Sequence, residues 1–393
     1  MTIETGLPYI IEQELFMNKL INNETLCVHA GTYRDPATGG VNTPIFTSSA
    51  NNYIGSEKQF YPRYFNTTNQ QSVIEKVCAL EKAEAGVLFG SGMAAISTTL
   101  LALLAPEDHA VIQAEVYGGT YSLIEKHFIS QGFDCALVAT DADAVIAAVT
   151  DKTRLIYIES PTNPLLSVID IAKVGDFARD NNIITVIDNT FASPVLQNPT
   201  MLGIDVVIHS GTKYLSGHSD LSCGIAVTSQ PLAEKIQAAA KLYGGCLNAQ
   251  DCYLLERSLK TLSLRVERQS ENAQIVAEML NAHEAIESVY YPGLENNPGH
   301  AIAKSQMAMF GAMLSFELKS QSAQDFLSRL RLIQSTLSLG GVESIICVPA
   351  ETSHLYLTDA ERESIGISPR LLRLSVGIEH IDDIISDIKQ ALT

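Results

Sequence analysis

A lysine that follows an apolar strand is the strongest chemical signal in the sequence. Lys213 lies in HSGTKYLSGHSD (209–220), directly after the apolar segment DVVIH. The surrounding serines, glycines and threonine offer hydroxyl and N–H groups that can bind a phosphate. A lysine enclosed in such a place can act as a Schiff-base amine. The alternative is a solvated lysine in a surface turn.

An aspartate closes another apolar strand, in VIDNTFASP (186–194). If the sheet is parallel, Asp188 lies at the same edge as Lys213. A buried carboxylate next to a pyridine nitrogen keeps that nitrogen protonated, and the ring then withdraws electrons from a substrate carbanion. Alone, Asp188 could simply cap the next turn. Together with Lys213, it predicts the cofactor pyridoxal 5'-phosphate.

A glycine-rich turn, FGSGMAAI (89–96), joins a short strand to a helix. Free N–H groups at a helix N-terminus suit a phosphate. The same residues also fit G-x-G-x-x-A, with Gly90, Gly92, Ala95 and the later Glu115, so an NAD-binding oxidoreductase is a rival hypothesis. That hypothesis leaves Lys213 without a role.

Two further residues have chemically suggestive surroundings. Tyr117, in VYGGTY, could stack on a flat heterocycle, although a tyrosine before two glycines is often a turn residue. Arg373 lies in the otherwise apolar strand RLLRLSV, where a lone charge needs an anionic partner. A substrate α-carboxylate fits that need. The alternative is a structural salt bridge to an acidic side chain.

Alternating strands and helices must position these residues. The predicted strands are almost entirely apolar, as in a mostly parallel α/β sheet covered on both faces. They are 110–114, 135–139, 154–159, 183–188, 205–210 and 224–228. Ligands bind beyond the carboxyl ends of such strands, which directs attention to Glu115, Glu159, Asp188 and Ser210. The predicted helices include 70–84, 264–284, 323–334 and 380–391.

Bulk properties exclude several classes of protein. The formal charge of −18 repels phosphate backbones, so we expect no nucleic-acid partner. Seven scattered cysteines without a C-x-x-C pair suit reduced thiols, and we expect neither a disulfide framework nor a metal site. The first residues carry no basic region before an apolar core, and no apolar run could span a bilayer. We therefore expect a cytoplasmic protein with no membrane partner.

Many separated motifs together resemble the pyridoxal-phosphate-dependent enzymes of cysteine and methionine metabolism, the trans-sulfuration family. They are CVHAGTYRDPATGGVNTPI, FGSGMAA, YGGTY, ESPTNP, IDNTFASP, HSGTKYLSGHSD, SLKTLSLR, YPGLENNPGH, SLGGVES and RLLRLSVGIEH. The resemblance covers nearly the whole chain. It implies the α/β type I aminotransferase-like fold, with a mostly parallel central sheet, helices on both faces and a smaller C-terminal α+β domain. It also implies an N-terminal arm (1–60) contacting a neighbouring subunit, a large cofactor domain (61–256) and a C-terminal domain (257–393).

The resemblance assigns roles to individual residues. Catalytic residues would be Lys213, Tyr117 and Asp188. Phosphate ligands would be Gly92, Met93, Ser210 and Thr212, joined by Tyr61 and Arg63 of a neighbouring subunit, while Asn163 would lie near the cofactor's phenolic oxygen. The amino-acid substrate would meet Arg373, Ser338, Asn163 and Glu343. The arm implies a homotetramer built from obligate dimers.

The residues near the substrate select only weakly among the family's reactions. Gly119 stands where methionine γ-lyases tend to carry a reactive cysteine, and Glu343 resembles a glutamate of members that handle cystathionine. We therefore expect a cystathionine γ-lyase or γ-synthase, with a sulfhydrylase or methionine γ-lyase-type C–S lyase as the alternative. A non-catalytic scaffold is disfavoured. Departures from the family pattern, such as PAETSH (349–354) with Tyr356 nearby, leave the exact substrate open.

Overall fold

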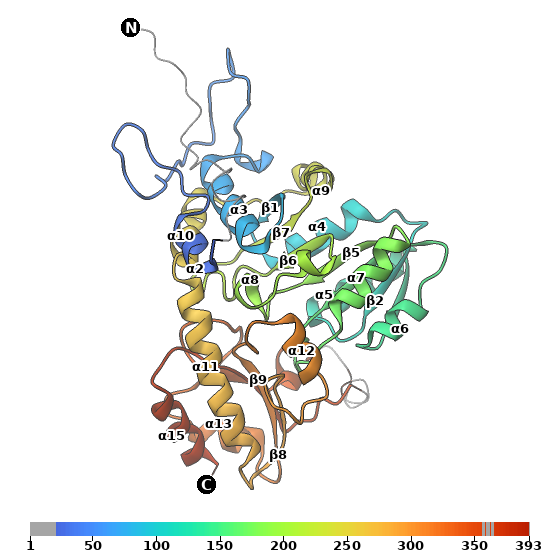
Figure 1. Cartoon of the computed structure of the whole chain (residues 1–393), viewed down its shortest axis with the longest axis vertical. Coiled ribbons are helices and arrows are strands. Elements are labelled where there is room, and N and C mark those ends of the chain that lie inside the picture. The colour runs from blue at the N-terminus through green and yellow to red at the C-terminus, as the bar shows by residue number, and fades with distance from the viewer. Residues whose placement is uncertain (1–20, 356–357, 359–361, 363–364, 393) are drawn as a thin grey trace. The chain divides into compact units, whose positions relative to one another are not determined.

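The computed structural model describes residues 21–355, 358, 362 and 365–392 (Figure 1). These residues fall into two compact units. The first comprises Met1–Leu103 and Val206–Ser263, and the second comprises Leu104–Asp205 and Leu264–Thr393. The units divide the chain at other places than the expected boundaries after residues 60 and 256. The three-part division therefore stays a prediction, and Tyr356 lies outside the described residues.

Three short strands form the sheet of the first unit. β7 (Gly224–Thr228) runs antiparallel to both β1 (Ala85–Phe89) and β6 (Val206–His209). All five residues of β7 are buried, because helices pack against this apolar strand. The helices of the unit are α2 (Asn23–His29), α3 (Thr68–Glu81), α4 (Gly92–Leu103), α9 (Gln230–Tyr243) and α10 (Ala249–Leu259).

Residues 23–43 of the N-terminal arm pack on their own unit. α2, which the sequence analysis missed, buries Leu26 and Cys27. The fully buried Lys76 of α3 donates from Nζ to the carbonyl oxygen of Cys27 at 3.0 Å. Farther along, the Thr43 hydroxyl donates to the Glu256 carboxylate of α10 at 3.0 Å. Residues 23–43 thus have a fixed course over α3 and α10.

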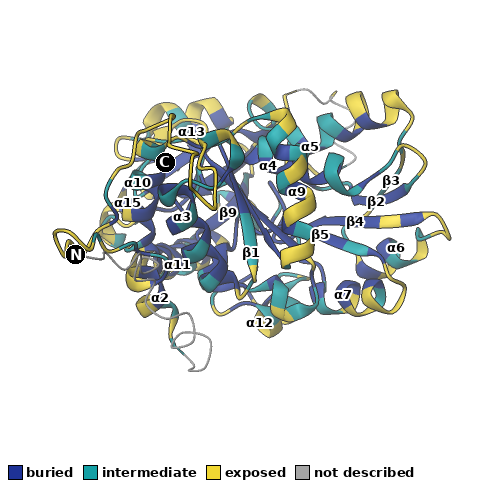
Figure 2. Cartoon of the chain, turned by 90° about the horizontal axis from the view of Figure 1, so that it is seen from above, coloured by how far each residue is buried: buried dark blue, intermediate teal, exposed yellow. Residues whose placement is uncertain are grey.

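Four parallel strands open the second unit, in the order β5, β4, β2, β3. Their bounds are β2 (His109–Gln113), β3 (Asp134–Val138), β4 (Thr153–Glu159) and β5 (Ile184–Asp188). Figure 2 shows the strands mostly dark blue, and yellow concentrated on the outward faces of the helices. The helices are α5 (Gly118–Leu123), continued by a π-helical turn (Ile124–Phe128), α6 (Ala142–Ala147), α7 (Ile171–Asp180) and α8 (Ser193–Leu196). The predicted strands are thus confirmed to within one residue.

A second sheet of five strands follows in the same unit, in the order β10, β11, β12, β9, β8. They are β8 (Ile286–Tyr290), β9 (Met313–Leu318), β10 (Gln334–Ser335), β11 (Ile345–Cys347) and β12 (Leu371–Ser375). Apolar side chains of this sheet form one core with α11 (Leu262–Asn281), α13 (Ala323–Arg329) and α15 (Ile381–Ala391). α12 (His300–Gln306) completes the unit. This is the expected smaller α+β part.

The helix predicted over 323–334 ends early. α13 stops at Arg329, and Gln334–Ser335 pairs with β11 instead. The residue responsible is distant in sequence: the buried carboxylate of Asp387 in α15 accepts the N–H groups of Arg331, Leu332 and Ile333 at 2.8–2.9 Å.

Within the described residues, no helix combines the length and apolar composition needed to cross a bilayer.

Candidate active site

Lys213 lies in a tight turn that follows β6 in the first unit. Its N–H donates to the Ser210 carbonyl at 3.1 Å, and its own carbonyl accepts the Gly217 N–H at 2.8 Å. Gly211 is required here, since a Cβ at that position would lie 2.4 Å from Cys223 Sγ. The side chain of Lys213 is half-buried. These contacts favour an enclosed lysine over a solvated one.

The N-terminus of α4 lies next to this turn. A Cβ on Gly92 would lie 2.8 Å from Ser210 Cβ, so only glycine permits the approach. Ser91 accepts the N–H groups of Ala94, through its hydroxyl at 3.1 Å, and of Ala95, through its carbonyl at 3.2 Å. The first N–H groups of a helix have no intrahelical acceptor. Those of Gly92 and Met93 are therefore suited to an anion beside Ser210.

Thr212 makes two side-chain hydrogen bonds within the first unit. Its hydroxyl donates to the Cys223 carbonyl at 3.1 Å and accepts the Cys223 N–H at 3.0 Å. These two bonds join the turn of Lys213 to the start of β7. Thr212 thus stabilises the turn, and its hydroxyl would have to give up a partner to bind a phosphate.

Asp188 ends β5 in the second unit and is 5% exposed. One carboxylate oxygen, Oδ1, accepts the N–H of Thr190 at 3.0 Å and its hydroxyl at 2.5 Å. On the neighbouring strand, Glu159 is its direct register partner. Two buried carboxylates therefore end adjacent parallel strands.

Glu159 is the functional candidate to which the sequence analysis gave no role, although its place at a strand end had marked it. Its Oε2 accepts the N–H of Tyr117 at 2.8 Å, and its Oε1 accepts the N–H of Asn163 at 3.0 Å. Burial, together with the negative charge of Asp188, raises the pKa of Glu159 well above its usual range. The spacing of 42 residues to Tyr117 hides this contact from sequence inspection.

Arg373 of β12 contacts both of its expected neighbours. Nη1 donates to the side-chain oxygen of Asn163 at 2.7 Å, and Nη2 donates to the Ser338 carbonyl at 3.2 Å. The residue is 5% exposed, and Nε has no hydrogen-bond partner among the described residues. No acidic side chain of the described part pairs with it, so the structural salt bridge gains no support. A buried guanidinium with an unused donor is suited to a carboxylate ligand.

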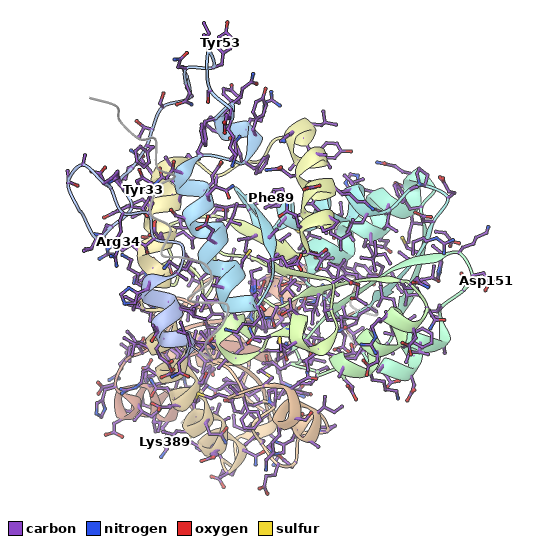
Figure 3. All side chains as sticks on the ribbon, turned by 45° about the horizontal axis from the view of Figure 1, so that its top comes forward. Tyr33, Arg34, Tyr53, Phe89, Asp151 and Lys389 are labelled. Carbon is purple, nitrogen blue, oxygen red and sulfur yellow. The ribbon has the colours of Figure 1, made fainter. Side chains whose placement is uncertain are left out.

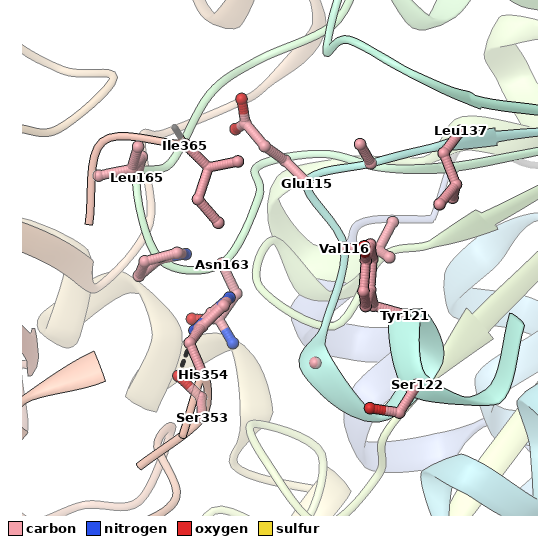
Figure 4. Close-up of a pocket in the computed structure, with 13 residues that line it drawn as sticks. Glu115, Val116, Tyr121, Ser122, Leu137, Asn163, Leu165, Ser353, His354 and Ile365 are labelled. Atoms are coloured by element: carbon pink, nitrogen blue, oxygen red, sulfur yellow. Dashed lines mark hydrogen bonds between the residues drawn. The ribbon is translucent and has the colours of Figure 1, made fainter. Parts of the chain in front are cut away.

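A pocket of about 170 Å³ in the second unit borders this arginine site (Figure 4). Asn163 lines it together with Glu115 and His354, among mostly apolar side chains. His354 Nδ1 lies 2.9 Å from the Ser353 hydroxyl. Burial, with Arg373 and Arg362 nearby, lowers the pKa of His354 to about 4. The imidazole is therefore neutral at physiological pH and does not compete with Arg373 for a carboxylate ligand.

The remaining candidates lie on exposed segments. The Tyr117 ring, just before α5, is 43% exposed and so can be covered by a ligand. Glu343 is exposed on the loop between Ser338 and β11. In the first unit, the Arg63 guanidinium donates to the Lys241 carbonyl at 2.5 Å and lies 5.8 Å from the Tyr61 ring centroid. The structure thus brings Tyr61 and Arg63 together.

Comparisons with known proteins agree with this geometry. The sequence model of the family described as Cys/Met metabolism PLP-dependent enzyme matches residues 24–393. A cystathionine beta-lyase of Lactococcus lactis subsp. cremoris (strain MG1363) is 43% identical over 94% of this chain and 98% of its own length. An L-methionine gamma-lyase of Fusobacterium nucleatum subsp. nucleatum is 40% identical, over 94% and 97%. The crystal structure of cystathionine gamma-lyase from Lactobacillus plantarum complexed with L-serine superposes with a TM-score of 0.91 at 40% identity, covering 94% and 98%.

The fold and the strand-end residues define a pyridoxal-phosphate-dependent enzyme. The chain belongs to the Cys/Met metabolism PLP-dependent enzyme family. It is a trans-sulfuration enzyme acting on sulfur amino acids, and its cofactor is pyridoxal 5'-phosphate. This result confirms the predicted fold class and cofactor, and it sets aside the NAD-binding and non-catalytic alternatives.

Proposed function

We propose that the chain acts on cystathionine, as a γ-lyase or γ-synthase that breaks or forms the bond between sulfur and Cγ. Relatives named cystathionine gamma-lyase and cystathionine gamma-synthase, 42% and 43% identical to it, support this choice. A relative named cystathionine beta-lyase, at 44%, supports cystathionine as the substrate but not the γ-reaction. An amino-acid substrate is supported mainly by Arg373, a buried guanidinium. Among the described residues, its Nε has no hydrogen-bond partner and no acidic side chain pairs with it. Arg373 and Asn163, with Ser338, would bind and orient the α-carboxylate, while the Ser338 carbonyl holds the guanidinium in place.

The cofactor side fits the residues around Lys213. The N–H groups of Gly92 and Met93, with Ser210, would hold the phosphate. Thr212 would contribute by holding the turn of Lys213. When bound, pyridoxal phosphate withdraws electrons from the substrate Cα, and a protonated ring nitrogen strengthens that effect.

Lys213, Asp188 and Tyr117 would carry the remaining steps. Lys213 Nζ would hold the cofactor and, once released, move the proton from substrate Cα. In γ-chemistry it would also take a proton from Cβ. Asp188 Oδ would keep the proton on the ring nitrogen, and the Tyr117 ring would cover one face of the cofactor.

Specificity would depend on residues near the distal end of the substrate. The exposed carboxylate of Glu343 would bind the distal ammonium group of cystathionine, a charge-assisted contact. The second candidate is a methionine γ-lyase-type enzyme, favoured by the relative named L-methionine gamma-lyase at 40% identity, or else a sulfhydrylase. Gly119, which offers no reactive thiol, argues against methionine γ-lyase activity.

The arm suggests a homotetramer of obligate dimers. Residues 41–61 expose large apolar side chains, including Val41 and Ile54 at 74% each. Tyr61 and Arg63 would reach the cofactor phosphate of the neighbouring subunit. All seven cysteines are free thiols, which is consistent with a reducing, cytoplasmic location.

Product analysis tests the proposal. Purified holoenzyme would be given cystathionine, methionine, cysteine, and acyl-homoserines with and without cysteine. A γ-lyase releases cysteine, 2-oxobutyrate and ammonia from cystathionine, whereas a γ-synthase forms cystathionine from an acyl-homoserine and cysteine. Release of homocysteine and pyruvate from cystathionine would show β-elimination and contradict the proposal. Turnover of methionine without any turnover of cystathionine would contradict it as well.

A further inference from the structure

Glu159 occupies a position that costs the fold stability. It is 4% exposed, and its register partner Asp188 carries a second buried carboxylate. Burying one carboxylate is unfavourable, and a like charge on the neighbouring strand adds to the cost. The backbone of Glu159 does not depend on its own side chain, because Gln113 binds both its N–H at 3.1 Å and its carbonyl at 3.0 Å. Buried, mutually repelling carboxylates are common at functional sites, so this position points to a role for Glu159 beyond packing.

The two oxygens of Glu159 bind two different loops. Oε2 accepts the N–H of Tyr117, after β2, and Oε1 accepts the N–H of Asn163, after β4. Asn163 in turn binds Arg373 through its side chain at 2.7 Å. A continuous series of hydrogen bonds therefore runs from the Tyr117 backbone to the guanidinium of Arg373.

The start of α5 is held on its other side as well. A Cβ on Gly118 would lie 2.3 Å from the Ser353 carbonyl oxygen, so Gly118 packs directly on the segment that carries His354. Tyr117 is thus fixed between that segment and Glu159. Its ring remains 43% exposed, so the contacts set the backbone position and leave the ring face available.

We propose that Glu159 is a positioning residue of the active site, whose single carboxylate sets the spacing between Tyr117 and the Asn163–Arg373 pair. The assignment deepens the proposed function, on which the roles of Tyr117 and Arg373 rest. Both oxygens are needed, because each binds one N–H. Glu159→Gln keeps one acceptor and turns an NH₂ group toward the other N–H, whereas Glu159→Ala removes both acceptors.

Amide hydrogen exchange on the full-length holoenzyme, without substrate, tests the two contacts directly. Glu159→Ala should speed exchange in peptides covering 115–121 and 160–166 by about tenfold or more, and Glu159→Gln in one of them. The control is Glu317→Gln, since Glu317 is a half-buried carboxylate of β9 that accepts the Ser368 hydroxyl at 2.6 Å, and both residues lie outside the two peptides. Unchanged exchange in both peptides would overturn the proposal. Faster exchange extending into α11 would also overturn it, by showing a general structural role.

Steady-state kinetics separate positioning from stability. We expect kcat/KM to fall about tenfold in Glu159→Gln and further in Glu159→Ala, with thermal midpoints near wild type and the control Glu317→Gln unaffected. The acid limb of kcat/KM should flatten in Glu159→Gln, which resembles protonated Glu159 at every pH. Asp188, Glu115 and Tyr157 face the carboxylate and remain unchanged. Kinetic losses that merely follow a lower thermal midpoint would contradict the assignment. If cystathionine is not the substrate, the exchange result still stands, so the two proposals fail separately.

Discussion

The guanidinium of Arg373 makes two hydrogen bonds through its Nη atoms, and its Nε has no partner in the part of the chain that the structure describes. Arg373→Lys keeps the charge but loses the planar arrangement of donors. A hydrogen bond to a charged group contributes about 1.5–3 kcal/mol, so we expect kcat/KM for the amino-acid substrate to fall on the order of 10- to 100-fold, mainly through KM. The matched control is Arg370→Lys, an exposed arginine just before β12. Equal effects of the two substitutions would argue against carboxylate binding.

His354, next to this arginine, makes stability depend on pH. Its pKa is near 6.5 in the unfolded chain and about 4 in the folded one. Between these values the unfolded state binds more protons, so the contribution is fully present above pH 6.5 and is lost as the pH falls toward 4. The loss should reach about 3 kcal/mol, from 1.36 kcal/mol per pKa unit. Urea unfolding from pH 7 to 4 should show a shallower decline in His354→Gln than in wild type.

The control for this experiment is His127→Gln, because His127 is exposed. Its decline with pH should match that of wild type. A His354→Gln protein that declines as steeply as wild type would show that His354 is not the group responsible.

At the scale of single elements, Asp387 joins α15 to the chain that leaves α13. Its two oxygens accept three backbone N–H groups, those of residues 331–333. Asp387→Ala removes every one of these acceptors, and we expect a loss of about 2–4 kcal/mol in the free energy of unfolding. Asp383→Ala, an exposed aspartate in the first turn of α15, should cost less than about 1 kcal/mol. Similar losses in the two variants, measured by urea unfolding, would refute the role of Asp387.

The sequence predicted the strands well, but it did not predict the contacts of Asp387. Uniformly apolar strands with polar residues at their ends predicted β2, β4 and β5 closely, because burial on both faces leaves a clear pattern. The predicted end of α13 was wrong, because the residue that redirects the chain after Arg329 is Asp387, more than fifty residues away in sequence. Glu159 was visible as a strand end, but its contacts depend on loops that meet only in the folded chain. Local patterns predict elements, whereas non-local hydrogen bonds decide where some elements end and which site residues act together.

At the scale of the whole molecule, the strongly acidic chain has an arm that exposes several large apolar side chains. A net charge of −18 favours solubility, yet residues 41–61 expose Val41, Ile45, Phe46, Tyr53, Ile54, Phe60 and Tyr61. Figure 3 shows Tyr53 at the end of a loop that extends away from α3 and α10 of its own unit. Exposed apolar side chains of this size in one segment indicate an interaction surface. A second copy of the chain is the occupant that the proposed function implies.

Mixing two inactive variants tests whether the arm completes a neighbouring site. Lys213→Ala removes the lysine of its own subunit, and Arg63→Ala removes the arm's cation. If Arg63 serves the neighbouring subunit, a mixed dimer contains one site with both residues intact, so subunit exchange should restore part of the activity. Lys213→Ala mixed with Arg373→Ala is the control, because both of those residues would serve their own subunit and no intact site can form. Proven exchange without recovery in the first mixture would show that Arg63 serves its own subunit, in keeping with its bond to Lys241.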